Sequence, residues 1–261
     1  MKKFLGKGYT FFETNLQFSN IPTIFIHGVG LNSTMWRPQK KFFNNNKKNT
    51  IYYDLLNHGK SESGFKKLSF FDFSNQLLQL IEFLKIKKFN LVGFSIGALI
   101  AQHFAEKHSK KINKLIIIAS IYNRSDEQRK KIIKRYKDAL QGNSISDDSI
   151  RRWFNADYLK LNPKIYDYFF NILEKKLNEN FLPAYKLFVN ADKYKVDFSN
   201  FNIPTLIMTG ENDVGSTPEM SQFLSKEIKN SNVCIIPKAK HMVTFEKANL
   251  VNIKISNFLF K

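Results

Sequence analysis

The feature that most constrains this chain is a short turn between an apolar run and a helix-forming run, Gly93-Phe94-Ser95-Ile96-Gly97. Residues 89–92 predict a buried strand, and residues 98–102 predict the start of a helix. A turn this sharp leaves no room for a Cβ at the two flanking positions, so both must be glycine. The turn exposes the Ser95 hydroxyl at a helix N-terminus, where backbone N–H groups favour negative charge. The spacing therefore predicts a nucleophilic serine rather than an ordinary strand-to-helix loop.

Other apolar runs predict further buried strands, at residues 22–26, 50–54, 115–119, 204–208 and 233–236. Helical patterns separate them, and one opens on Ser69 with Asp72 three residues later, the arrangement of a capping box. This alternation predicts the α/β class, with a mostly parallel, doubly wound sheet. We also expect an edge hairpin in residues 9–18 that turns at residues 13–15, and one long final helix over residues 243–260.

Residues 121–200 interrupt this alternation, because they contain helical patterns and many aromatic residues but no strong strand pattern. We therefore expect a core domain made of residues 1–120 and 201–261. The segment 121–200 should form a helical cap, or lid, over the carboxyl edge of the sheet, where ligands bind in such folds.

A serine hydroxyl needs a base within hydrogen-bond reach. Of the five histidines, His103 and His108 lie inside the helix after Ser95 and cannot turn back to it. His27 and His58 follow predicted strands and lie nearer to the site. His241 stands between the last strand and the last helix, at the same sheet edge as Ser95, and we predict that it is the general base.

The base in turn needs a carboxylate that orients it. Asp213 and Glu211 both follow the penultimate strand, and we favour Asp213 because its shorter side chain suits a rigid turn. The negative oxygen of a tetrahedral intermediate needs two backbone donors. We expect these to be the N–H groups of Ile96, directly after the serine, and of Val29, in the loop after the first parallel strand.

Four motifs together resemble the α/β-hydrolase fold family, in its esterase and lactonase branch; they occupy residues 27–36, 53–61, 93–97 and 211–218, and the His241 loop completes the set. The sequence is similar to 3-oxoadipate enol-lactonases and to pimeloyl-ester carboxylesterases. The resemblance implies the chain order Ser95, Asp213, His241, no cofactor and no metal. It departs from the usual pattern where Phe94 replaces a common histidine and where Asn57 replaces a common Pro-Gly turn. We expect substrate contacts from four residues: Trp36, Phe94, Trp153 and Met242.

The resulting hypothesis is a serine hydrolase that cleaves a carboxylic ester or lactone of a small to medium acyl group through an acyl-enzyme. Two alternatives keep the same fold. The triad could hydrolyse a C–C bond or a thioester, or the protein could be a non-catalytic ligand receptor.

The net charge of +19 raises the possibility of a nucleic-acid partner. Most of the basic residues are scattered lysines, and the one dense run, residues 129–135, has the spacing of a solvated helix face. We therefore expect no specific nucleic-acid partner. No apolar run is long enough to span a bilayer, and a lone cysteine, Cys234, forms no internal disulfide. A cytoplasmic monomer or homodimer is the expectation.

Overall fold

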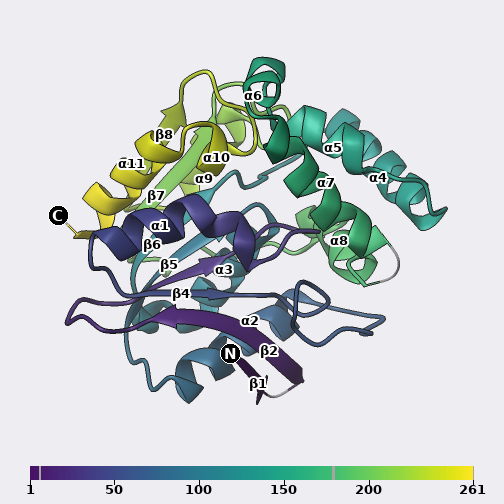
Figure 1. Ribbon diagram of the computed structural model, residues 1–261. Coiled ribbons are helices and arrows are strands. Elements are labelled where there is room, and N and C mark those ends of the chain that lie inside the picture. The colour runs from purple at the N-terminus through teal and green to yellow at the C-terminus, as the bar shows by residue number, and fades with distance from the viewer. Residues whose placement is uncertain (6, 178–179, 261) are drawn as a thin grey trace.

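The computed structural model describes residues 1–5, 7–177 and 180–260. In these ranges the chain forms an eight-stranded sheet with the order β1-β2-β4-β3-β5-β6-β7-β8 (Figure 1). The strands are β1 (Lys2–Leu5), β2 (Gly8–Asn15), β3 (Thr23–Ile26), β4 (Thr50–Tyr53), β5 (Phe89–Phe94), β6 (Ile112–Ile118), β7 (Thr205–Gly210) and β8 (Ser231–Ile236). All six strands from β4 to β8 in this order run parallel, so the predicted mostly parallel sheet is confirmed.

The N-terminal edge differs from the expected hairpin. Residues 13–15 are not a turn, because β2 continues through them as a single strand. Its register pairs Phe12 with Tyr53 and Asn15 with Thr50, antiparallel to β4. The hairpin instead joins β1 to β2. Pairing with β4, far away in the sequence, keeps Glu13 and its neighbours extended.

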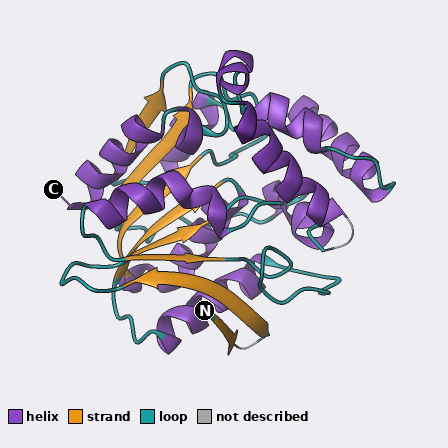
Figure 2. Ribbon diagram, viewed as in Figure 1, coloured by secondary structure: helices purple, strands orange, loops and turns teal. Residues whose placement is uncertain are grey.

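Helices cover both faces of the sheet, as Figure 2 shows. One face packs against α2 (Phe70–Phe83), α3 (Ile96–His108) and α9 (Pro218–Glu227). The other face packs against α1 (Arg37–Asn45) and α11 (Ala248–Phe260), with α10 (Val243–Glu246) beside it. Two short 3₁₀ helices also occur here: η1 (Ser33–Trp36) lies between β3 and α1, and η2 (Ser109–Lys111) lies between α3 and β6. The predicted capping box of α2 is present, because the Asp72 carboxylate accepts from the Ser69 N–H at 2.8 Å.

Alternate residues of each central strand enter opposite cores. Ile24 and Ile26 pack with α2 and α3, whereas Phe25, between them, packs with Trp36 and Tyr52 on the other face. Because both faces are covered, these strands are apolar throughout rather than alternating. The sequence patterns described above did not predict helix α1, which ends at Asn45.

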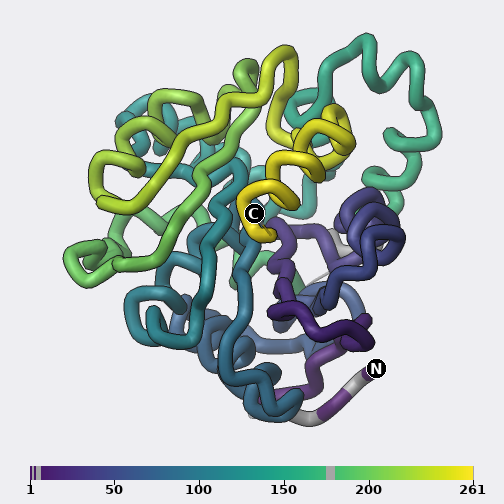
Figure 3. The backbone as a smooth tube through the Cα atoms, turned by 90° about the vertical axis from the view of Figure 1, so that its left-hand side faces the viewer, coloured from purple at the N-terminus to yellow at the C-terminus, as the bar shows by residue number. Residues whose placement is uncertain are grey.

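Between β6 and β7 the chain forms five α-helices and a 3₁₀ helix, namely α4 (Asp126–Leu140), α5 (Ser146–Trp153), α6 (Ala156–Leu161), α7 (Pro163–Leu177), α8 (Leu182–Val189) and η3 (Ala191–Lys193). Figures 1 and 3 both show the teal helices α4 to α6 at the upper end of the molecule. Residues in the loops that follow β3, β5, β6 and β7 line one cavity together with residues of α4 and α5.

The final helix is broken, contrary to expectation. Lys247 has φ −128° and ψ 40°, which ends α10 before α11 begins at Ala248. The Glu246 carboxylate accepts from the backbone N–H groups of Asn155 and Lys240, each at 2.6 Å. The bond from Asn155 holds the short helix α10 against the helices between β6 and β7, and the bond from Lys240 joins α10 to the loop before it. Within the described ranges, no helix combines the length and the apolar character that crossing a bilayer requires.

Candidate active site

Ser95 stands at the end of β5 in a backbone conformation that side chains rarely adopt, with φ 54° and ψ −116°. Two close approaches force this turn. A Cβ on Gly93 would lie 2.7 Å from the Ala98 Cα, and a Cβ on Gly97 would lie 2.8 Å from the Ile26 carbonyl carbon. The strand-to-helix turn therefore depends on both glycines, and it presents Ser95 at the N-terminus of α3.

The loops after β7 and β8 bring a carboxylate and an imidazole together. His241 Nδ1 lies 2.6 Å from Asp213 Oδ2, and both side chains are largely buried. The other Asp213 oxygen accepts from the N–H groups of Gly215 and Ser216 at 2.8 and 3.0 Å. These bonds fix the carboxylate, which in turn makes Nδ1 the protonated nitrogen and leaves Nε2 as a base.

Glu211, the alternative carboxylate, binds a backbone N–H group instead of His241. Its side chain accepts from the Lys238 N–H at 2.9 Å and makes no contact with His241 among the described hydrogen bonds. The loops can approach this closely because Gly210 has no Cβ, which would otherwise lie 2.8 Å from the Ala239 carbonyl carbon.

Ser95 and His241 line the same cavity, together with Asp213. The ring of Phe94, next to Ser95 in the chain, lies 5.0 Å from the His241 ring, centroid to centroid. In the part of the chain described, no hydrogen bond joins Ser95 Oγ to His241. Bonds of this kind are often long in unliganded enzymes and shorten when substrate binds.

Two histidines that we placed near the site, His27 and His58, join the loop after β3, which carries Val29, to the loop after β4. His58 Nε2 accepts from the Gly30 N–H at 3.1 Å, while its Nδ1 faces the Leu56 carbonyl at 2.9 Å. His27 binds in the same way, with Nε2 accepting from the Leu55 N–H at 2.9 Å. Both rings are fully buried, so they fix backbone rather than transfer protons to a substrate. Sequence reasoning missed this positioning role.

The cavity has a volume of about 180 Å³ and lies between the carboxyl edge of the sheet and helices α4, α5 and α8. Of the expected substrate contacts, Phe94 and Trp153 line it, as does Val29. Trp36 and Met242 do not; they are fully buried, Trp36 behind the Phe94 ring and Met242 with its N–H donated to the Trp153 carbonyl. Ile96 is buried as well, but its backbone N–H is the first of α3.

Four cationic side chains also line the cavity, and sequence reasoning missed them: Arg124, Lys131, Arg135 and Arg152. We interpreted residues 129–135 as a solvated helix face, and this is wrong for Arg135, whose Nε is buried. The spacing of residues 128, 131 and 135 along one side of α4 was the available signal, since positions three or four apart share a helix face.

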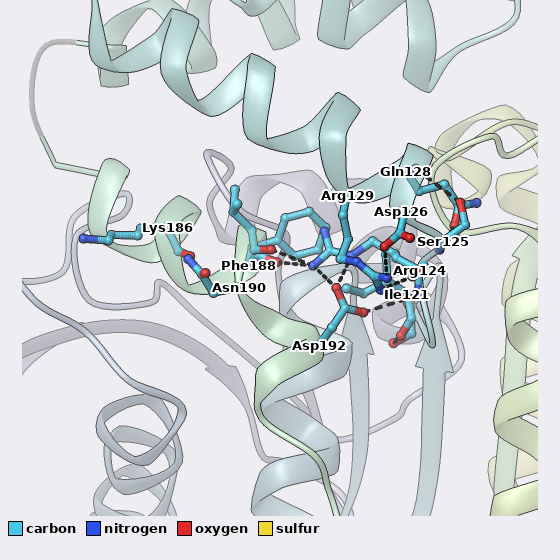
Figure 4. Close-up of polar contacts among 12 residues, drawn as sticks. Ile121, Arg124, Ser125, Asp126, Gln128, Arg129, Lys186, Phe188, Asn190 and Asp192 are labelled. Atoms are coloured by element: carbon cyan, nitrogen blue, oxygen red, sulfur yellow. Dashed lines mark hydrogen bonds and ion pairs between the residues drawn. The ribbon is translucent and has the colours of Figure 1, made fainter.

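Arg124 anchors both ends of the helical segment to one another (Figure 4). Its guanidinium donates to Asp192 at 2.8 Å and to the carbonyls of Phe188 and Val189 at 3.0 and 2.8 Å. Arg129 in turn donates to the Arg124 carbonyl. Burial lowers the pKa of Arg124, while the charge of Asp192 opposes that change. Arg124 thus forms an ion pair with Asp192. Its contacts join the chain just before α4 to the chain around η3.

Among the described residues, no group of three or more His, Cys, Asp or Glu side chains could hold a metal ion. The candidate chemistry rests on the hydroxyl of Ser95, the imidazole of His241 and the carboxylate of Asp213.

A parallel sheet with a strained serine turn after its central strand, and with an Asp–His pair on the neighbouring loops, defines the class of α/β hydrolases. The chain belongs to the alpha/beta hydrolase fold family, whose model matches residues 22–248.

Two curated relatives are similar over most of their length. The chain is 26% identical over 233 residues to (E)-2-((N-methylformamido)methylene)succinate hydrolase from Acinetobacter baylyi, covering 88% of this chain and 87% of the relative. It is 28% identical over 252 residues to the pimeloyl-[acyl-carrier protein] methyl ester esterase of Wigglesworthia glossinidia brevipalpis, covering 88% and 90%. Among solved structures, the enol-lactonase from Burkholderia xenovorans LB400 matches with a TM-score of 0.89 and 19% identity, over the whole of both chains. These relatives are hydrolases, and the expected fold class is confirmed.

Proposed function

We propose that this protein is a serine hydrolase that cleaves a carboxylic ester or a lactone through an acyl-enzyme. The observation that carries the proposal is the Asp213–His241 pair, held at 2.6 Å beside the cavity into which Ser95 also faces. A similar curated relative is itself named an ester esterase, which supports the same reaction type.

In the proposed first half-reaction, Ser95 Oγ attacks the carbonyl carbon and its proton passes to His241 Nε2. Asp213 stabilises the imidazolium through the Nδ1–H bond. The N–H groups of Val29 and Ile96 bind the negative oxygen, a contribution of about 3–4 kcal/mol for each donor. The imidazolium then protonates the leaving alcohol. In the second half-reaction, His241 takes a proton from water, which attacks the acyl-enzyme and releases the acid.

In this proposal residues 121–200 act as a cap over a core formed by residues 1–120 and 201–261. The cap supplies Trp153, whose ring lies 6.3 Å from that of His241, and thereby excludes water from the imidazole. The cavity is small beside the roughly 300–1,000 Å³ of pockets for drug-sized ligands, so a small acyl group is favoured.

The test is the exchange Ser95→Ala. We expect hydrolysis of short-chain p-nitrophenyl esters and of lactones to fall by about 10³-fold or more, because the nucleophile is lost. Labelling by a fluorophosphonate probe should also disappear. Ser199→Ala, at an exposed serine outside the cavity, is the matched control and should retain both signals.

Equal rates for the wild type and Ser95→Ala would contradict the proposed mechanism. A folded wild-type protein that is not labelled at Ser95 would favour a non-catalytic receptor. Activity on a thioester or a 1,3-diketone, but on no ester or lactone, would keep the triad and change the substrate.

A further inference from the structure

The side of the cavity formed by α4 and α5 contains two arginines without a counter-ion. Arg135 projects from α4 and Arg152 from α5, and both line the cavity with Ser95 and His241. Among the described residues, neither lies within 4 Å of a carboxylate oxygen, and the one hydrogen bond of Arg152 is a 3.5 Å contact with the Asp148 carbonyl. Arg135 lies beside the Tyr185 hydroxyl, and its Nε–H is buried without an acceptor.

The other arginine and lysine that line the cavity both have carboxylate partners. Arg124 is paired with Asp192 at 2.8 Å, and Lys131 with Glu127 at 2.6 Å. Arg151, next to Arg152 in the chain, points to solvent and is paired with Asp147 at 2.7 Å. Of the arginines and lysines that line the cavity in the described ranges, Arg135 and Arg152 are thus the two without a carboxylate partner.

This arrangement is electrostatically costly for the empty protein. Burial, together with the neighbouring charge of Arg135, lowers the pKa of Arg152 to about 10. Arg152 still carries its charge at neutral pH, so two like charges share a cavity with few acceptors. The charges of Asp213 and Asp148 act on Arg152 only from beyond 4 Å, and a partly buried cation of this kind is stabilised by an anion that hydrogen-bonds to it directly. A guanidinium offers a planar fork that matches a carboxylate.

We infer that the cavity binds a substrate with a free carboxylate of its own, separate from the ester or lactone group, and that Arg135 and Arg152 hold this carboxylate. The part of this inference that concerns hydrolysis rests on the proposed function. The part that concerns binding of the carboxylate does not. Both arginines line the same cavity as Ser95, so the bound carboxylate lies near the reacting carbonyl. With a cavity of about 180 Å³, this geometry favours the half-ester of a short dicarboxylic acid, or a lactone of similar size.

The test compares the monomethyl and dimethyl esters of succinate, glutarate and adipate. Each pair shares one carbon skeleton and differs in one negative charge. We expect the wild type to prefer the monoester in at least one pair by about tenfold or more in kcat/KM per ester group, because the carboxylate meets two guanidinium groups. In Arg152→Gln and Arg135→Gln this ratio should fall by about tenfold.

Arg151→Gln is the matched control, because it removes the same charge from the adjacent residue of the same helix without touching the cavity. It should leave the ratio of monoester to diester at the wild-type value. The inference is overturned if the wild type prefers the neutral diester in every pair, or if Arg152→Gln and Arg151→Gln give the same ratio.

A binding measurement separates this inference from the proposed reaction. Calorimetric titration of the dicarboxylates into Ser95→Ala should show binding that weakens about tenfold when Arg152→Gln is added, but not when Arg151→Gln is added. Arg152-dependent binding in a protein that hydrolyses no ester would refute the reaction and keep the anion site. Ser95-dependent hydrolysis without a preference for the anionic partner would refute the anion site alone. Circular dichroism of each variant verifies that it is folded.

Discussion

Side chains of the same type have different roles in this protein, depending on the groups around them. The histidines are the clearest example. His241 has its Nδ1 against a carboxylate and faces a cavity, which suits proton transfer. His27 and His58 use both ring nitrogens on backbone groups and are fully buried, so they position loops. His103 packs face to face with Phe70 at 4.1 Å and does not line the cavity. The surroundings of a titratable residue thus decide its role.

His103 should make stability depend on pH. Burial lowers its pKa from 6.5 to about 4, with a smaller opposing contribution from Glu106. Between these two values the unfolded chain binds a proton that the folded protein does not, so stability is lost as pH falls from about 6.5 toward about 4. We expect the free energy of unfolding of the wild type to fall by about 2–3 kcal/mol more than that of His103→Gln between about pH 7 and about pH 4.5.

Urea unfolding of both proteins at the two pH values measures this difference. His108→Gln, at a less deeply buried histidine of the same helix, should change the pH dependence less. If the wild type and His103→Gln lose the same amount of stability, the imidazole is not held neutral by packing.

The element that defines the site is the β5–turn–α3 unit. The strand ends at Phe94, and α3 starts at Ile96, so a single residue makes the connection. Such a turn stores backbone strain at Ser95, and the sheet on both sides of β5 maintains it. The same principle applies after β7, where Gly210 lets the Asp213 and His241 loops meet.

Gly93→Ala should therefore disrupt this element. The new Cβ would lie 2.7 Å from the Ala98 Cα, and backbone at this point cannot move without shifting α3. We expect a loss of about 3 kcal/mol or more in the free energy of unfolding, measured by urea denaturation. Gly142→Ala is the comparison, because its φ of 80° is unfavourable but no atom lies within 4 Å of the new Cβ. Its cost should be only about 1 kcal/mol; equal costs would show that the close approach in the turn is unimportant.

At the scale of the whole molecule, the helical segment between β6 and β7 is joined to the sheet by the chain at its two ends, and these ends meet at Arg124 (Figure 4). Other contacts attach its middle, notably the bonds from Asn155 to Glu246 of α10. The arrangement forms the cavity from two parts of the chain, because neither the sheet edge nor the helices enclose it alone.

Arg124→Met should loosen this junction. The exchange keeps the bulk of the side chain but leaves Asp192 and two backbone carbonyls without their donor. We expect a loss of about 3 kcal/mol, with faster hydrogen exchange in residues 121–125 and 186–193 than in α2 or α3. Arg151→Met, which breaks an exposed pair in the same segment, should cost much less than Arg124→Met. Uniform changes in exchange over the whole chain would contradict a local anchoring role.

The sequence by itself determined the six parallel strands, the serine turn, and the candidates Asp213 and His241. These follow from local patterns, since apolar runs report which residues avoid water, and the carboxyl ends of parallel strands share an edge. Only the tertiary structure decided that residues 13–15 pair with β4, that Lys247 breaks the last helix, that Trp36 and Met242 lie behind the cavity wall, and that Arg135 and Arg152 face into it. A charged residue on a helix has the same local pattern whether it faces solvent or a cavity, because its surroundings come from elements far away in the chain.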